Sequence, residues 1–178
     1  MDMKLFPVSP LLLLPVLAAG QNAPTPRPSA DLKNPAGQRV AFQFRTLPAS
    51  FQIYTCRPAN DGFAWAGPDP DAVLISEDKT LIVHHYKGPT WEAQDGSMVR
   101  SDGKLAKHFL APTGNAIHWL ELPAQEPTGK FAGVTFIHRI DTAGGLPPSG
   151  KACDAQHAGE QERVSYSATY LFYAPTQR

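Results

Sequence analysis

The sequence predicts an all-β protein: a single antiparallel β-sandwich or barrel of about nine to eleven short strands with one disulfide. Three observations support this fold class. Runs of alternating polar and apolar residues recur along the chain, 18 prolines and 14 glycines are spread through it, and no segment has a convincing amphipathic helical pattern. Alternation with a period of two places one face of each strand against a core. Short strands with Pro- and Gly-rich connections are typical of antiparallel sandwiches and barrels.

The segment 163–173 has the clearest strand pattern in the chain. Its apolar residues alternate with polar ones, so that one face carries Val164, Tyr166, Ala168, Tyr170 and Phe172. The same criterion predicts further strands at 39–45, 50–56, 72–76, 80–87, 116–122 and 133–141.

Two Asp-Gly pairs, Asp95-Gly96 and Asp102-Gly103, predict local topology. Asp-Gly suits the type I′ turn, in which both central residues adopt positive φ. We therefore expect residues 90–110 to form a three-stranded meander. The alternative is a pair of surface turns within an irregular loop.

The first twenty residues have the features of a signal peptide. Lys4 precedes a short apolar run, Leu11–Ala19, that is too short to span a bilayer. We predict cleavage after Gly20, with cleavage after Ala18 or an uncleaved membrane anchor as alternatives. No other segment could cross a membrane, so we expect a secreted or periplasmic protein.

Residues 21–36 form a predicted linker, because four prolines lie there among small and polar residues, a composition that favours extended chain. Residues 37–178 then form a single β domain. The chain without its leader has about 158 residues, which is the size of one domain. A domain of that size needs no metal ion in order to fold.

Cys56 and Cys153 are the two cysteines of the chain. A disulfide persists in the oxidising compartment that an exported chain enters, and two cysteines allow one intramolecular pairing. A bond between them would close a loop of about 98 residues. Two buried free thiols, or a metal site built on both thiolates, remain the alternatives.

The charges balance, with 16 basic and 16 acidic residues and no basic run. A neutral chain of this kind argues against nucleic acid as a partner and against an anionic membrane surface.

The central segment His85-Tyr86-Lys87-Gly88-Pro89-Thr90-Trp91-Glu92, followed by Asp95-Gly96-Ser97, resembles the signature of an uncharacterised family, domain of unknown function 3455, of secreted bacterial and fungal proteins. Further matches extend the resemblance over roughly residues 35–173. They lie at 35–37, 52–56, 65, 116–120, 133–139, 153–155 and 166–173. His118 and Thr169 depart from the usual pattern, which has a proline and an aspartate at these positions.

The resemblance implies an exported β-rich domain with a bridging disulfide and no established activity, so no catalytic residue can be transferred to this chain. Some members carry a malate dehydrogenase label. The sequence gives that label no support, because it has no GxG and no alternating βα pattern.

Aromatic residues near expected strand ends predict a binding surface. Flat apolar faces beside a few polar groups suit sugars and other small ligands. The hypothesis places Tyr86 and Trp91 in contact with the ligand, with His85 beside them and Glu92 or Asp95 as polar anchors. The ligand would be a small molecule, a glycan or an envelope component. The alternative is that these aromatic side chains are ordinary core or rim packing.

Three histidines form a second hypothesis. His85, His118 and His138 could supply nitrogen ligands to zinc or copper, although their spacing matches no compact ligand motif. Otherwise we expect no cofactor. The alternative is that buried histidines hydrogen-bond within the core and the others are solvated.

Two carboxylates support a weaker enzyme hypothesis. Glu92 and Asp95 could serve as the acid pair of a glycosidase, if one of them stays protonated. Ser97, His85 and Asp95 could be imagined as a catalytic triad. The sequence argues against it, because it lacks the nucleophile elbow that usually carries such a serine. The best functional prediction is a non-catalytic ligand- or envelope-binding module, followed by a secreted metal- or carboxylate-dependent enzyme and by a purely structural envelope protein.

Overall fold

The computed structural model describes residues 26–176, which contain ten β-strands and four short 3₁₀ helices. The predicted leader, residues 1–20, lies outside this range. No helix in the described range is long and apolar enough to cross a membrane.

The strands are β1 (Gln38–Thr46), β2 (Phe51–Ala59), β3 (Gly62–Ser76), β4 (Ile82–Tyr86), β5 (Thr90–Ala93), β6 (Met98–Arg100), β7 (Lys107–Phe109), β8 (Trp119–Pro123), β9 (Phe136–Gly144) and β10 (Gln161–Pro175). The 3₁₀ helices are η1 (Ser29–Asp31), η2 (Gly103–Leu105), η3 (Gly129–Phe131) and η4 (Ala155–His157).

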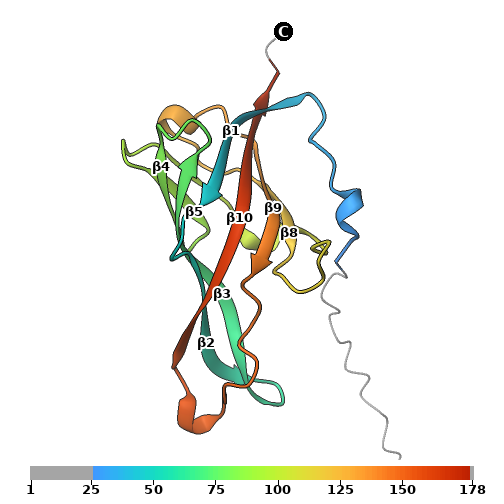
Figure 1. The fold of residues 1–178 in the computed structure, drawn as a ribbon, viewed down its shortest axis with the longest axis vertical. Helices are drawn as coiled ribbons and strands as arrows, with labels where there is room; N and C mark the ends of the chain where they lie inside the picture. The colour runs from blue at the N-terminus through green and yellow to red at the C-terminus, as the bar shows by residue number, and fades with distance from the viewer. Residues whose placement is uncertain (1–25, 177–178) are drawn as a thin grey trace, which may run out of the picture.

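All ten strands belong to one antiparallel sheet, in the order β6-β5-β4-β3-β1-β10-β9-β8-β7. The long strand β10 lies between β1 and β9 (Figure 1). The remaining strand, β2, pairs with β3 on one side and with β10 on the other. The prediction of an all-β antiparallel fold is therefore confirmed.

The sheet curls until β6 meets the chain that follows β8. Arg100 and Gln125 form an isolated antiparallel bridge, with reciprocal N–H to O distances of 3.0 and 2.7 Å. The Ser101 hydroxyl donates to the Pro123 carbonyl at 2.7 Å, and the Lys130 N–H donates to Ser97 Oγ at 2.9 Å. One curled sheet whose β6 edge is bridged to the chain after β8 is closer to the predicted barrel than to two separate packed sheets.

The concave side of this sheet holds the hydrophobic core. The alternation predicted for 163–173 is present in β10, where Tyr166, Ala168, Tyr170 and Phe172 are buried. Phe44 of β1 packs against Phe172, with ring centroids 5.0 Å apart. Leu74, Val83, Val99 and Ile137 from neighbouring strands complete the cluster.

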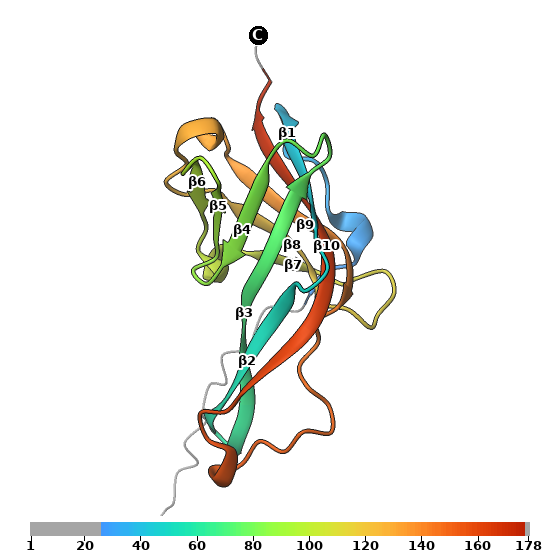
Figure 2. The same cartoon turned by 60° about the vertical axis from the view of Figure 1, so that its left-hand side comes forward.

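A narrow arm extends from this body (Figure 2). It consists of β2 with the first half of β3 and the first half of β10. The loop before β10 lies along the arm and is tied to it by the Cys56–Cys153 disulfide, whose Cα atoms are 5.5 Å apart. The predicted pairing is thus confirmed. Tyr54 adds a second tie, because its hydroxyl donates to the Gly145 carbonyl at 2.6 Å.

The predicted meander over 90–110 is only partly correct. β5 and β6 form the expected hairpin, but β7 pairs with β8, and Gly103–Leu105 is a 3₁₀ helix whose N-terminus is capped by Asp102. The hairpin turn also differs from type I′, because Gly96 has φ +80° whereas Asp95 is not among the residues with positive φ. The Asp95 carboxylate instead accepts a hydrogen bond from the Ser97 N–H at 3.0 Å.

Part of the predicted linker lies against the outer face of the sheet. Arg27 forms a parallel bridge with Phe109 of β7, and its carbonyl accepts from Leu110 N–H at 2.6 Å. Further along, the Tyr173 hydroxyl donates to Asn34 Oδ1 at 2.8 Å. Residues 26–36 therefore cover β7 and the neighbouring strands and protect an open sheet edge.

Candidate functional site

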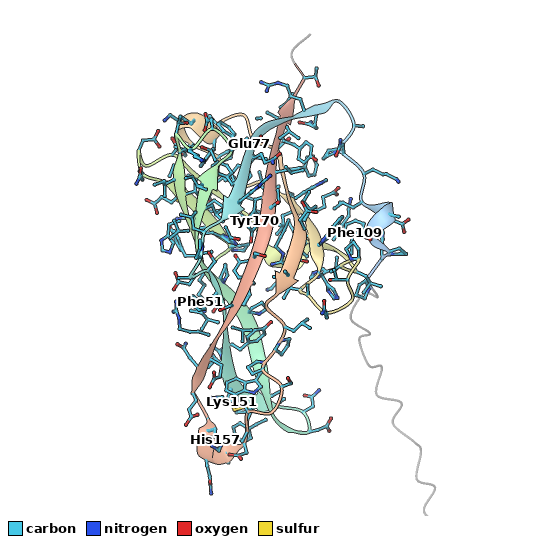
Figure 3. All side chains as sticks on the ribbon, viewed as in Figure 1. Phe51, Glu77, Phe109, Lys151, His157 and Tyr170 are labelled. Atoms are coloured by element: carbon cyan, nitrogen blue, oxygen red, sulfur yellow. A yellow bond between two sulfur atoms is a disulfide. The ribbon has the colours of Figure 1, made fainter. Side chains whose placement is uncertain are left out.

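A cavity of about 260 Å³ opens on the concave side of the sheet, near the junction of the body and the arm. Figure 3 shows Tyr170, one of its lining residues, midway along β10. The cavity combines apolar walls with a few polar groups, which is the usual composition of a small-molecule site. Its lining residues are Gln52, Pro68, Asp69, Pro70, His85, Gly88, Pro89, Trp91, Gly103, Ala106, His108, Leu120, Leu122, Arg139 and Tyr170.

His85 and Trp91 form a stacked pair in the cavity wall. They are directly opposite each other on β4 and β5, with ring centroids 4.3 Å apart and planes 6° apart. Tyr170 meets both rings edge-on, at 5.2 and 5.9 Å. Opposed residues of an antiparallel pair lie on one face of the sheet, so the strand register alone brings the two rings together.

Burial keeps His85 neutral. The side chain is 3 % exposed, and loss of solvation lowers its pKa to about 3. Nδ1 lies 2.9 Å from the Thr90 carbonyl oxygen, which can only accept, so Nδ1 carries the proton. In the neutral ring, Nε2 is therefore left as a hydrogen-bond acceptor.

Arg139 supplies a positive charge to the opposite wall. It is half-buried on β9, opposite Tyr170 on β10 and Leu120 on β8. Nε and Nη2 donate to the His118 carbonyl oxygen at 3.1 and 2.8 Å. The guanidinium is thus held toward the cavity by a neutral acceptor rather than by a carboxylate.

Two further histidines lie beside Arg139. The rings of His108 and His118 meet edge-on with centroids 5.7 Å apart, and His108 lines the cavity. Burial lowers the pKa of each, and the charge of Arg139 lowers both further. Both rings are therefore neutral at pH 7.

Two buried nitrogen atoms of the cavity residues have no hydrogen-bond partner among residues 26–176: Nε2 of Gln52 and Nε1 of Trp91. A buried N–H group without a partner costs free energy, and such groups are uncommon in folded proteins. Both residues line the cavity and are 1 % exposed. Both of these unmatched nitrogen atoms are donors.

The five residues of the predicted binding surface do not share one surface. His85 and Trp91 face the cavity, whereas Tyr86 and Glu92 lie on the outer face, where the Tyr86 hydroxyl donates to Glu92 Oε2 at 2.8 Å. Asp95 lies in the hairpin turn, 2.9 Å from Lys130 Nζ. Successive side chains of a strand point to opposite faces, which separates the set.

The arrangement of acids does not match the enzyme hypothesis. Lys130, assisted by Ser97, holds the pKa of Asp95 down at about 2, the opposite of the shift that a general acid needs. The Ser97 Oγ accepts from the Lys130 N–H, and the His85 ring is engaged with Thr90 and Trp91. The imagined triad is not assembled.

The three histidines proposed as metal ligands do not converge. His85 faces the cavity, but His138 alternates with Arg139 on β9 and so lies on the other face of the sheet. It is buried there against Tyr173, and its Nε2 is 3.4 Å from Glu121 Oε2. Residues 26–176 contain no group of three or more His, Cys, Asp or Glu side chains that could hold a metal ion.

Sequence reasoning missed Gln52, His108, Arg139 and Tyr170 as parts of one site. The signal for Arg139 was its position two residues after Ile137, on the same strand face. An arginine that shares a face with a core isoleucine is half-buried, and a half-buried charge needs a partner.

The described residues thus form a disulfide-linked all-β fold with an interior cavity. The family described as "Protein of unknown function (DUF3455)" matches residues 35–174, and the chain belongs to this family. The comparisons with curated proteins and with solved structures gave no match.

Proposed function

We propose that this protein is an exported, non-catalytic binding module that holds a small organic ligand in its interior cavity. The observation that carries the proposal is the cavity itself, in which apolar walls surround a stacked His85–Trp91 pair and the half-buried Arg139. Its volume of about 260 Å³ is just below the usual range for ligand sites, so the ligand is small. The disulfide supports export, because such bonds persist in oxidising compartments.

Relocation of the site from the outer hairpin to the interior revises the sequence-based hypothesis. Tyr86 and Glu92 bond to each other, and Asp95 is paired with Lys130, so these groups are already engaged on the outside. The inner wall instead has an acceptor on His85 and donors on Arg139, with the unpartnered Gln52 amide buried behind it. Specific sites use few polar groups, each in a fixed position.

The test is a ligand-observed NMR screen of small fragments against the oxidised protein, repeated with the cavity filled. Ala106 lines the cavity and is half-buried, so Ala106→Phe should occupy its space and abolish binding. Ala64→Phe, at an exposed position in the arm, is the matched control and should bind as the native protein does. Near-ultraviolet circular dichroism checks that both variants fold.

Equal binding by the native protein and Ala106→Phe would place the site elsewhere. No fragment binding at all would favour the purely structural envelope role.

A further inference from the structure

We propose that the cavity takes a singly charged carboxylate with a small apolar body, and that Arg139 binds its anionic end. This inference rests on the proposed function and names the class of ligand. Two observations support it: the positive charge of Arg139 has no partner among the described residues of the cavity, and its guanidinium has N–H groups free to donate.

Arg139 is the uncompensated charge of the cavity. The only other lining residue of fixed charge is Asp69, and its Oδ2 is already 2.9 Å from Lys87 Nζ. None of the ion pairs found within residues 26–176 includes Arg139. A half-buried guanidinium has lost part of its hydration, so an anion that pairs with it gains more than it would in open solvent.

The guanidinium also has donors to spare. Arginine carries five N–H groups, and two of them are directed at the His118 carbonyl. The remaining N–H groups have no carboxylate among the described residues. Carboxylates suit a guanidinium group well, because both are planar and the hydrogen bonds between them are charge-assisted.

The other polar groups that line the cavity near Arg139 carry no charge that would balance its own. Burial holds the pKa of His85 at about 3, so this ring is neutral, and burial raises the pKa of Tyr170, so its hydroxyl remains protonated. Gln52 adds a buried amide donor without a partner. A negative ligand would therefore meet one unpaired positive charge, since the one carboxylate of the described lining, Asp69, is paired with Lys87.

The size and the remaining walls restrict the class further. One cation can balance one negative charge, so a dianion such as a phosphate monoester would carry a surplus charge into a partly apolar space. Leu120, Leu122 and Pro89 supply the apolar lining. These walls favour a monocarboxylate with an aromatic ring or a short alkyl chain.

The experiment compares acids with amides of the same shape. Phenylacetate and phenylacetamide, and then hexanoate and hexanamide, are titrated into the oxidised native protein while the indole N–H signal of Trp91 is followed by NMR. Trp91→Phe assigns that signal among the three tryptophans. We expect each acid to bind roughly ten- to a hundredfold more tightly than its amide, as for a hydrogen-bonded charge pair.

Two variants test the role of Arg139 directly. Arg139→Met should remove the preference for the acid, and Arg139→Lys should keep part of it. Arg163→Met is the matched control, because Arg163 is an exposed arginine, paired with Asp71, and should leave the preference unchanged. The comparison on the native protein stands even if Arg139→Met fails to fold.

The outcomes separate the two proposals. Amides that bind as tightly as acids would overturn the carboxylate inference and leave the cavity function standing. A preference that survives in Arg139→Met would also overturn it. If neither member of either pair binds at millimolar concentration, the carboxylate inference is contradicted. If the fragment screen is also empty, the cavity function fails as well.

Discussion

His85 and Trp91 lie face to face across the β4–β5 pair, with ring centroids 4.3 Å apart. The same two rings belong to the hydrophobic interior and to the cavity wall, since Trp91 is 1 % exposed and also meets Phe172 edge-on at 5.9 Å. A residue with both roles cannot be removed without a cost in stability.

The first prediction concerns Trp91. The sequence-based hypothesis placed its side chain in contact with a ligand at a binding surface. Its burial leads to a different expectation: Trp91→Ala should lower the free energy of unfolding by about 3–5 kcal/mol, because it leaves a large void. Urea denaturation measures this loss. Trp65→Ala, at a half-buried position in the arm, should cost clearly less, and equal losses would contradict the core role of Trp91.

The second prediction concerns pH. The pKa of His85 is about 3 in the folded protein and near 6.5 when it is unfolded, so the unfolded state binds more protons between these values. Stability must therefore rise with pH across this window and fall as the medium is acidified. From pH 7 to pH 5, His85 should cost about 2 kcal/mol.

The variant His85→Phe isolates this effect. It keeps an aromatic ring next to Trp91 but cannot take up a proton, so its unfolding free energy should depend less on pH between 7 and 5. His108, His118 and His138, whose pKa values are also lowered by burial, retain a smaller dependence of the same sign. Parallel pH profiles for the native protein and the variant would show that His85 is not the source.

The third prediction concerns the disulfide. Replacing both Cys56 and Cys153 by alanine should lower the free energy of unfolding by about 2–5 kcal/mol, because the unfolded chain loses a long cross-link. A reductant should destabilise the native protein by a similar amount and leave the double variant unchanged. A loss well below this range would mean that the other contacts of the loop hold it to the arm without the bond.

The fourth prediction compares two glycines of one loop. Gly145 and Gly150 both have positive φ, +77° and +84°. A Cβ at Gly145 would lie 2.9 Å from Tyr166 Cβ, whereas one at Gly150 would meet nothing within 4 Å. Gly145→Ala should therefore destabilise the protein more than Gly150→Ala, which bears only the backbone strain of about 1 kcal/mol. Equal melting temperatures for the two variants would contradict the close packing at Gly145.

The alternation of polar and apolar residues predicted most of the strands but not which strands pair with each other. The pattern of β10 was readable because one face of this strand is apolar and the other is polar. The first half of β3 was missed because Gly67, Pro68 and Pro70 normally interrupt strands. The structure tolerates them where β3 pairs only with β2 and its other side is an open edge.

The candidate site was harder to predict for a related reason. Both faces of β9 are covered, one by the core and the other by residues 26–36. The alternation of side chains along the strand therefore places His138 and Arg139 on opposite faces but does not show which of the two faces the cavity. The residues of segment 85–97 were predicted to form one binding surface because they are close in sequence. Folding into two strands sends neighbours such as His85 and Tyr86 to opposite faces.

The position of β10 in the sheet has a consequence for the order of folding. This strand follows the other nine described strands in the sequence, yet it pairs with β1, β2 and β9. A chain that stops before Gln161 would leave all three of these strands with unpaired edges, and such edges associate readily with other chains. The body cannot close until the C-terminal strand is available, so folding depends on contacts between distant parts of the sequence and should be slow.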